Sequence, residues 1–258
     1  MANILALICA RAGSKGVKGK NIRDFLGFPI AYYTLSAYSL FLDCYADKNS
    51  IYTLVLNTDS EDLIMQFAKT RLPHTVIPRT ESLSGDSVSK IDVIRDSLSK
   101  AESLSSNTYD IVLDMDLTSP LRKASDIKNI IDALVSDKGA DIALSVTEPR
   151  RNPYFNQLVK DENGYLKTAI KSNFVTRQQA PEVFDANASL YAYNPRYLKN
   201  SDGIFLHAAL VGAMMEDTGI LDIDSEKDFE LMQVVAQYLF KNDSELAKIR
   251  ENIPSILK

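Results

Sequence analysis

Residues 10–21, with the sequence ARAGSKGVKGKN, form a basic loop directly after an apolar run near the N-terminus. The loop carries Gly13, Gly16 and Gly19 together with the cations Arg11, Lys15, Lys18 and Lys20. Glycines let a backbone bend tightly and approach a ligand, and cations on such a turn neutralise phosphates. Neither GxxxxGK(S/T) nor GxGxxG spacing is present, and a solvated loop is the alternative. The cluster of glycines and cations favours phosphate binding.

A pair of aspartates lies near the other end of the chain, in the sequence ILDIDSEKDFEL. If Ile220–Ile223 is a strand, Asp222 and Asp224 point to the same face, where two carboxylates repel unless a cation lies between them. Such hard oxygen ligands suit Mg²⁺. The alternative is a strand end that leads into a helix capped by Ser225, with Asp228 completing a capping box. Both interpretations can hold together, so we expect a magnesium site.

A third polar stretch, DMDLTSPLRKASDI, occupies residues 114–127. Asp114 and Asp116 again have the spacing of one strand face, Pro120 fixes a turn, and Ser125 is the expected N-cap of the next helix. Asp116 is nearer the loop and is expected to bind a ligand hydroxyl or a metal. For Asp114, a buried carboxylate that only accepts backbone hydrogen bonds is an equal alternative.

Apolar runs alternate with helical patterns along the first part of the chain, which predicts an α/β domain with a mostly parallel sheet. We expect strands at residues 4–9, 51–56, 75–77, 111–115 and 142–146, and helices at 30–42, 61–71, 89–100 and 125–135. Ligands bind at the carboxyl ends of the strands in such sheets. The loops after residues 9, 57, 115 and 146 are therefore the expected functional loops.

Residues 148–186 break this alternation, because they are polar and contain prolines and an Glu-Asn-Gly turn between short alternating runs. This pattern predicts an inserted β-hairpin, with strands at residues 155–159 and 165–169. Beyond it we expect strands at 188–193 and 220–223, a helix at 226–241 and a weaker helix at 243–258.

The composition is that of a globular protein, with 45% hydrophobic and 24% charged residues and a formal net charge of −5. No basic stripe indicates a nucleic-acid partner, and no apolar run is long enough for a membrane helix. Two cysteines and the absence of a secretory signal pattern favour the cytoplasm. The residues alone therefore predict an α/β enzyme that holds a polyphosphate on the basic loop with Mg²⁺, for nucleotidyl or phosphoryl transfer.

Five motifs occur in the order seen in a known family: ARAGSKGVKGKN, IPRTESLSGDSVSKIDVI, TSPLR, NASLYAY and DIDSEKDFEL. The chain resembles the cytidylyltransferases that activate nine-carbon acidic sugars, which are the CMP-sialic acid synthetases and their relatives. The resemblance implies a Rossmann-like three-layer nucleotidyltransferase core, formed by residues 1–147 and 187–258. It also implies a homodimer in which the arm, residues 148–186, reaches the partner's active site. The expected reaction joins CTP and a nonulosonic acid into a CMP-sugar and pyrophosphate, with Mg²⁺.

The resemblance also implies roles for individual residues. Those expected at the nucleotide are Arg11, Ala12, Ser14, Lys15, Lys20, Asn21, Arg79, Val88 and Lys90. Those expected at the sugar are Asp116, Arg177, Gln178 and Asn187. Asp222 and Asp224 would bind the metal, and these two aspartates with Arg11 and Lys20 would be the catalytic residues.

The chain departs from the sialic acid enzymes at two positions near the expected sugar. Asp116 replaces a glutamine of their LQPTSPLR motif, and Asp185 replaces the arginine of their FRPNG motif. These departures make the chain more similar to the branch that activates legionaminic acid. The alternatives are a nucleotidyltransferase acting on a sugar 1-phosphate and a non-catalytic protein that binds CTP or a nucleotide sugar. The complete basic loop and both aspartates argue against the non-catalytic alternative.

Overall fold

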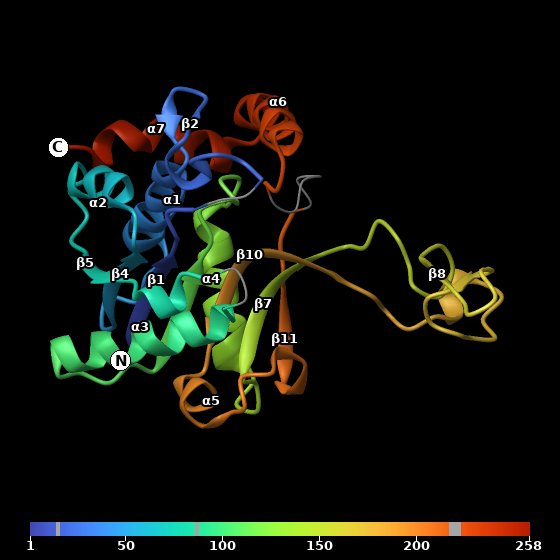
Figure 1. The fold of residues 1–258 in the computed structure, drawn as a ribbon. Coiled ribbons are helices and arrows are strands. Elements are labelled where there is room, and N and C mark those ends of the chain that lie inside the picture. The colour runs from blue at the N-terminus through green and yellow to red at the C-terminus, as the bar shows by residue number, and fades with distance from the viewer. Residues whose placement is uncertain (14–15, 86–87, 217–222) are drawn as a thin grey trace.

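A computed structural model describes residues 1–13, 16–85, 88–216 and 223–258 of the chain. Its centre is a seven-stranded sheet with the order β11-β7-β10-β6-β1-β4-β5 (Figure 1). The strands are β1 (Asn3–Cys9), β4 (Ile51–Thr58), β5 (Thr75–Pro78), β6 (Ile111–Met115), β7 (Ile142–Thr147), β10 (Asp185–Tyr193) and β11 (Leu210–Met214). Neighbouring strands are parallel, except that β10 runs antiparallel to both β6 and β7.

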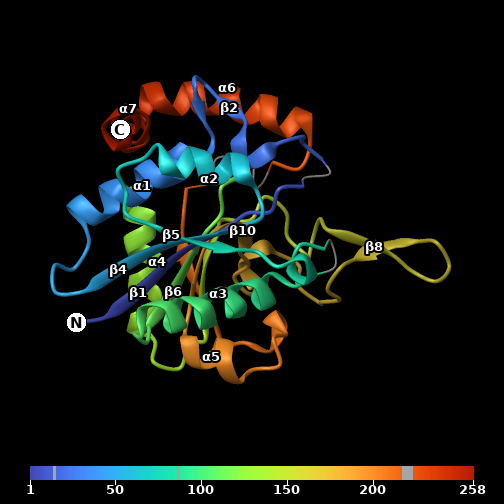
Figure 2. The same ribbon diagram turned by 60° about the vertical axis from the view of Figure 1, so that its left-hand side comes forward.

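Helices cover both faces of this sheet. The helices are α1 (Ala31–Cys44), α2 (Glu61–Ala68), α3 (Lys90–Ser105), α4 (Ala124–Ser136), α5 (Pro195–Asn200), α6 (Glu226–Asn242) and α7 (Ser244–Ile256). Apolar side chains of α1, α2, α4, α6 and α7 share one core cluster, and those of α3 and α5 belong to a second cluster. Figure 2 shows α3 and α5 on the side of the sheet opposite to α1, α6 and α7. The predicted three-layer α/β fold with a mostly parallel sheet is confirmed.

The central strands follow from continuous apolar runs, which are typical of parallel strands covered on both faces. In β1, Ile4 to Ile8 are all buried, and β6 is buried along its whole length. Helix starts follow from short polar residues: Ser60 accepts a hydrogen bond from the Leu63 N–H. The predicted capping box at the start of α6 is confirmed, with Ser225 and Asp228 bonded reciprocally.

The arm leaves the core after β7 and returns at β10, and Figure 1 shows it extending away from the sheet. It contains the predicted hairpin, formed by β8 (Leu158–Lys160) and β9 (Leu166–Thr168). Both strands are shorter than predicted, and β8 begins three residues later than the expected run. Apolar side chains of the hairpin are exposed, including Val159 and Tyr165. The division of the chain into a core and an inserted arm stays a prediction.

Other expectations differ from the structure. The helix expected from Ser125 begins one residue earlier, and its N-cap is Lys123, whose N–H donates to the Asp126 carboxylate. The strand β11 was not expected, because it is short, largely exposed and interrupted by Gly212. The helix α5 was not expected either, because its six residues are too few for a helical pattern. The strand expected at residues 220–223 falls mostly outside the described residues. Among the helices described, none is long and apolar enough to cross a membrane.

Candidate active site

A cavity of about 330 Å³ opens at the carboxyl ends of β1, β5 and β6. It collects seven of the residues expected at the substrates from four separate segments of the chain. They are Arg11, Lys20, Asn21, Arg79, Val88, Lys90 and Asp116. The edge at which the sequence placed the functional loops is therefore the edge at which the cavity forms.

Hydrogen bonds to neighbouring segments hold the start of the basic loop. The Ala12 N–H donates to Asp59 Oδ1 at 2.6 Å, and Asn21 Nδ2 donates to the Arg11 carbonyl at 3.2 Å. The Arg11 guanidinium reaches across the cavity to the Ser84 carbonyl at 3.4 Å. Ala12 is exposed and does not line the cavity, and Ser14 and Lys15 lie outside the described residues.

Lys20 joins the basic loop to Asp224. Its ammonium donates to the Ile223 carbonyl at 2.6 Å and lies 3.7 Å from Asp224 Oδ1. The backbones meet here as well, because a Cβ atom on Gly16 would lie only 1.8 Å from the Asp224 carbonyl oxygen. Asp224 itself is exposed, with 81% of its side chain accessible. Asp222, its expected partner for a metal, lies outside the described residues.

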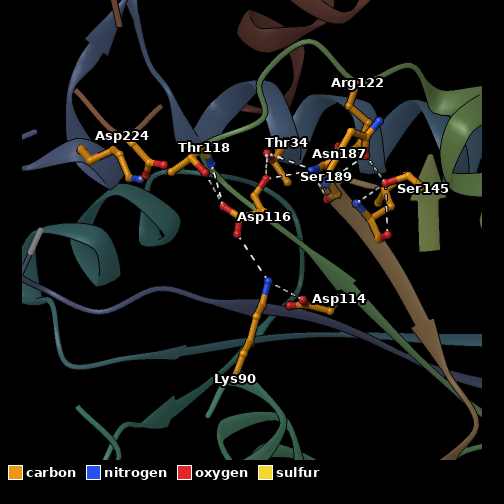
Figure 3. A network of polar contacts seen from close by, with 12 residues as sticks. Thr34, Lys90, Asp114, Asp116, Thr118, Arg122, Ser145, Asn187, Ser189 and Asp224 are labelled. Atoms are coloured by element: carbon orange, nitrogen blue, oxygen red, sulfur yellow. Dashed lines mark hydrogen bonds and ion pairs between the residues drawn. The ribbon is translucent and has the colours of Figure 1, made fainter. Parts of the chain in front are cut away.

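Lys90 and Asp116 line the cavity, and Lys90 also contacts the buried Asp114 (Figure 3). Lys90 Nζ lies 2.7 Å from Asp114 Oδ2 and 3.3 Å from Asp116 Oδ2. Asp114 is 1% exposed, and within the described chain neither of its oxygens accepts a regularly shaped hydrogen bond. The Lys90 ion pair is therefore what compensates its charge. Asp114 does not accept the backbone hydrogen bonds that were one expectation for it.

The surroundings of Asp114 and Asp116 shift the pKa values of the two carboxylates in opposite directions. Burial raises the pKa of Asp114 despite the nearby Lys90 ammonium. Burial also opposes ionisation of Asp116, but Lys90 and the two donors of Thr118 outweigh it and lower its pKa to about 2. Lys90 is desolvated too, yet its two carboxylate neighbours raise its pKa well above the ordinary value. Lys90 and Asp116 are therefore both charged at neutral pH.

A fully buried arginine, Arg122, anchors the loop that carries Asp116. Its guanidinium donates to the carbonyls of Asp116 at 2.8 Å and Ser189 at 2.6 Å, and to the Ser189 hydroxyl at 3.1 Å. Burial lowers the pKa of Arg122 to about 10, so it stays charged. No role was predicted for Arg122 from the sequence, and only its place in the TSPLR motif marked it. Its partner Ser189 lies 67 positions away.

Two residues expected at the sugar lie away from the cavity. Asn187 is 6% exposed, and its side-chain oxygen accepts hydrogen bonds from the Ser145 hydroxyl and the Ser189 N–H at a bulge of β10. Gln178 is exposed on a 3₁₀ turn of the arm, Arg177–Gln179. Neither of them lines the cavity, so the structure does not bring Asn187 or Gln178 together with the other expected substrate residues.

No group of three or more histidine, cysteine or acidic side chains within the described residues has the arrangement of a metal site. The expected Mg²⁺ ligands therefore reduce, in the described part, to Asp224. Its exposed carboxylate oxygens suit a hard cation, and it lies beside the basic loop where a triphosphate would bind. Cys9 lines the same cavity, but burial and then Asp114 raise the pKa of its thiol to about 12.

Comparison with known proteins identifies relatives over most of the chain. The family model described as cytidylyltransferase matches residues 5–239. The chain is 35% identical to "Post-translational flagellin modification protein B" of Campylobacter coli and 36% identical to "CMP-N,N'-diacetyllegionaminic acid synthase" of Campylobacter jejuni. Each of these matches covers 90% of this chain and 94% of the relative.

More distant similarities agree with this assignment. An N-acylneuraminate cytidylyltransferase of Streptococcus agalactiae is 27% identical over 87% of this chain and 51% of its own length. A solved structure of CMP:2-keto-3-deoxy-manno-octonic acid synthetase complexed with CTP superposes with a TM-score of 0.64, at 15% identity, and covers 92% of this chain and 99% of its own. The superposition shows the shared fold. The chain is therefore a nucleotidyltransferase that belongs to the cytidylyltransferase family.

Proposed function

We propose that this protein joins CTP to a nonulosonic acid to give a CMP-sugar and pyrophosphate.

 The proposed acid substrate is of the legionaminic type. The observation that carries the proposal is the cavity itself, which brings the expected nucleotide residues Arg11, Lys20 and Arg79 together with Asp116. The name of the relative at 36% identity, a CMP-N,N'-diacetyllegionaminic acid synthase, supports the nonulosonic acid and its type.

In the proposed reaction the anomeric hydroxyl oxygen of the acid bonds to the α-phosphorus of CTP, and the bond from that phosphorus to the bridging oxygen breaks. Pyrophosphate leaves with the bridging oxygen, and the hydroxyl proton is released. Arg11 and Lys20 would neutralise the triphosphate and the leaving pyrophosphate, because charge stabilisation dominates this chemistry. Arg79 and the segment around Val88 would contact the cytidine.

Mg²⁺ is part of the proposal, with Asp222 and Asp224 as its ligands. When bound, it would polarise the attacked phosphate and reduce the charge repulsion on it. The described ligand, Asp224, fits this role, because its carboxylate is exposed and lies beside Lys20. The contact between Lys20 and Asp224 would keep the metal site next to the basic loop.

We also propose a cytoplasmic homodimer. The arm extends from the core with apolar side chains such as Leu158, Tyr165 and Leu166 exposed, which favours burial against a second copy. Gln178 lies on this arm and outside the cavity of its own protomer. A partner's arm would therefore supply Arg177 and Gln178 to the sugar, and the use of CTP favours the cytoplasm.

The test is to incubate the protein with CTP, Mg²⁺ and a panel of nonulosonic acids and to measure pyrophosphate. Release is expected to be greatest with a legionaminic acid, and no release with any acid would reject the proposal. Hexose 1-phosphates in the same panel test the alternative acceptor class, which would give pyrophosphate from those sugars instead.

A matched pair of variants tests the metal assignment. Asp224→Asn should lower kcat by at least about a hundredfold, because a lost ligand weakens the charge stabilisation on which the transfer depends. Glu226→Gln is the control, since Glu226 is an exposed neighbouring carboxylate that is ion-paired with Arg23, whereas Asp224 lies beside Lys20 of the basic loop. Equal activities of the two variants would reject Asp224 as a ligand.

A further inference from the structure

Lys90 is the first residue of α3, and the helix dipole disfavours a cation at a helix N-terminus. Its ammonium instead contacts Asp114 at 2.7 Å and Asp116 at 3.3 Å, and lies 5.3 Å from the centre of the Tyr191 ring. Two carboxylates and an aromatic face thus surround the three N–H donors of Lys90.

Asp114 explains why the lysine stays in this position. It pairs with Leu7 of β1 and Tyr191 of β10 in the middle of the sheet, on the face that α3 covers. A buried carboxylate without a partner is unfavourable, so Asp114 holds the ammonium against the sheet. This leaves the Lys90 ammonium between Asp114 and Asp116, as Figure 3 shows.

Asp116 is fixed on every side except the cavity. Its N–H donates to the Ser189 carbonyl, and its own carbonyl accepts from Arg122 and from the Thr34 hydroxyl. Its Oδ1 accepts both the N–H of Thr118 at 2.9 Å and the Thr118 hydroxyl at 2.7 Å. Oδ2 accepts from Lys90 at 3.3 Å, and Asp116 itself lines the cavity.

An ionised carboxylate offers about four acceptor positions and no donor. Within the described chain, Thr118 fills two of these positions and Lys90 a third. One acceptor position on Oδ2 is left for a ligand in the cavity. An amide side chain at this position could turn to present either a donor or an acceptor, whereas Asp116 can only accept.

We propose that Lys90 is a positioning residue that orients Asp116 as a fixed hydrogen-bond acceptor for a donor group of the sugar, and that Lys90 does not bind the nucleotide. This inference rests on the proposed function. The substrate group that it selects is a hydroxyl or the N–H of an acylamino substituent. It also assigns different substrates to residues of one cavity wall, with Val88 facing the nucleotide and Asp116 the sugar.

The test measures how the variant Lys90→Met binds each of the two substrates, the acid and CTP. The KM for the acid should rise by about tenfold, the effect of weakening one charge-assisted hydrogen bond, because Asp116 loses its orientation. The Kd for CTP, measured by calorimetry without the acid, should stay within about twofold, since no nucleotide contact is lost. Lys90→Arg keeps the charge and should recover part of the affinity for the acid.

A second variant covers the case in which Lys90→Met does not fold because Asp114 is left unpaired. Lys90→Met with Asp114→Asn removes both charges of the pair, which is tolerated better than leaving the buried Asp114 carboxylate without its partner. It should fold and show the same split between acid KM and CTP Kd. Asp116→Asn should raise the acid KM and leave CTP binding unchanged.

Either of two results would overturn the inference: weaker CTP binding by Lys90→Met, or an unchanged acid KM in the folded double variant. Both are distinct from failure of the proposed function, which is judged on the wild-type protein by its release of pyrophosphate with the panel of acids. CTP binding is measured without turnover, so the nucleotide half of the inference is decided whichever acid is the substrate.

Discussion

Replacing Gly16 by alanine should push the basic loop away from Asp224, because the Asp224 backbone leaves no room for a side chain. A Cβ atom on Gly16 would lie 1.8 Å from the Asp224 carbonyl oxygen and 2.9 Å from its carbon. An ordinary contact begins at 3.4 Å, so the two backbones must separate by about 1.6 Å.

Such a displacement has two measurable consequences. It would stretch the contacts of Lys20 with the Ile223 carbonyl and with Asp224, so the cation and the carboxylate would leave their present alignment. A misplacement of about 1 Å can lower a catalytic rate by about a hundredfold. Overpacking costs about 1–3 kcal/mol, and each kcal/mol lowers the melting temperature of a chain of this size by about 2–4 °C.

Gly13→Ala is the matched control, because it adds the same methyl group to the same loop. A Cβ atom on Gly13 would meet no atom within 4 Å, so this variant should keep the wild-type melting temperature. Melting is measured by circular dichroism without CTP, which removes any contact between the new methyl and the nucleotide, and kcat is measured at saturating CTP. Equal melting temperatures for Gly16→Ala and Gly13→Ala would refute the close packing of the loop on Asp224.

Two further predictions concern stability, and urea denaturation measures both. Ala188 has a left-handed backbone with φ of 52°, so Ala188→Gly should raise the free energy of unfolding by up to about 1 kcal/mol; a decrease would contradict the strain. Burial raises the pKa of Asp126 from 3.8 to about 6, so this carboxyl stabilises the fold most below pH 3.8 and loses that contribution as pH rises through 6. Asp126→Asn should therefore raise the free energy of unfolding at pH 7 by about 1–3 kcal/mol and flatten its dependence on pH between 3.8 and 6. An unchanged slope of this free energy against pH would contradict the raised pKa of Asp126.

The sequence predicted the elements whose signals are local. Continuous apolar runs located β1, β6 and β7, and the polar residues Ser225 and Asp228 located the start of α6. The order of the strands and the antiparallel direction of β10 were not predicted, because pairing between distant strands leaves no mark in either strand alone. The edge strand β11 is apolar, but it is short, contains Gly212 and pairs only with β7, so its run is not distinctive.

The candidate site shows the same division. The sequence found the basic loop, Asp116 and the segment around Val88, and the fold brings them to one cavity. It did not predict that Lys90 pairs with Asp114 and Asp116, which lie 24 and 26 positions further along the chain, and the expected backbone hydrogen bonds of Asp114 are absent from its described surroundings. Side-chain pairing depends on the register of β6 against α3, which periodicity does not encode.

The contact between the basic loop and Asp224 joins residues about 200 positions apart, since Lys20 and the Ile223 carbonyl are separated by 203. The proposed substrates would place two electrostatic demands at this point, because a triphosphate needs cations and its metal needs carboxylates. If Lys20 and Asp224 were held by separate parts of the fold, their relative position could change when the ligand binds. Here Gly16 packs on the Asp224 backbone while Lys20 bonds to the preceding carbonyl, so the cation and the carboxylate are fixed relative to each other by main-chain contacts. The exposed Asp224 side chain remains available to a metal while its backbone does the positioning.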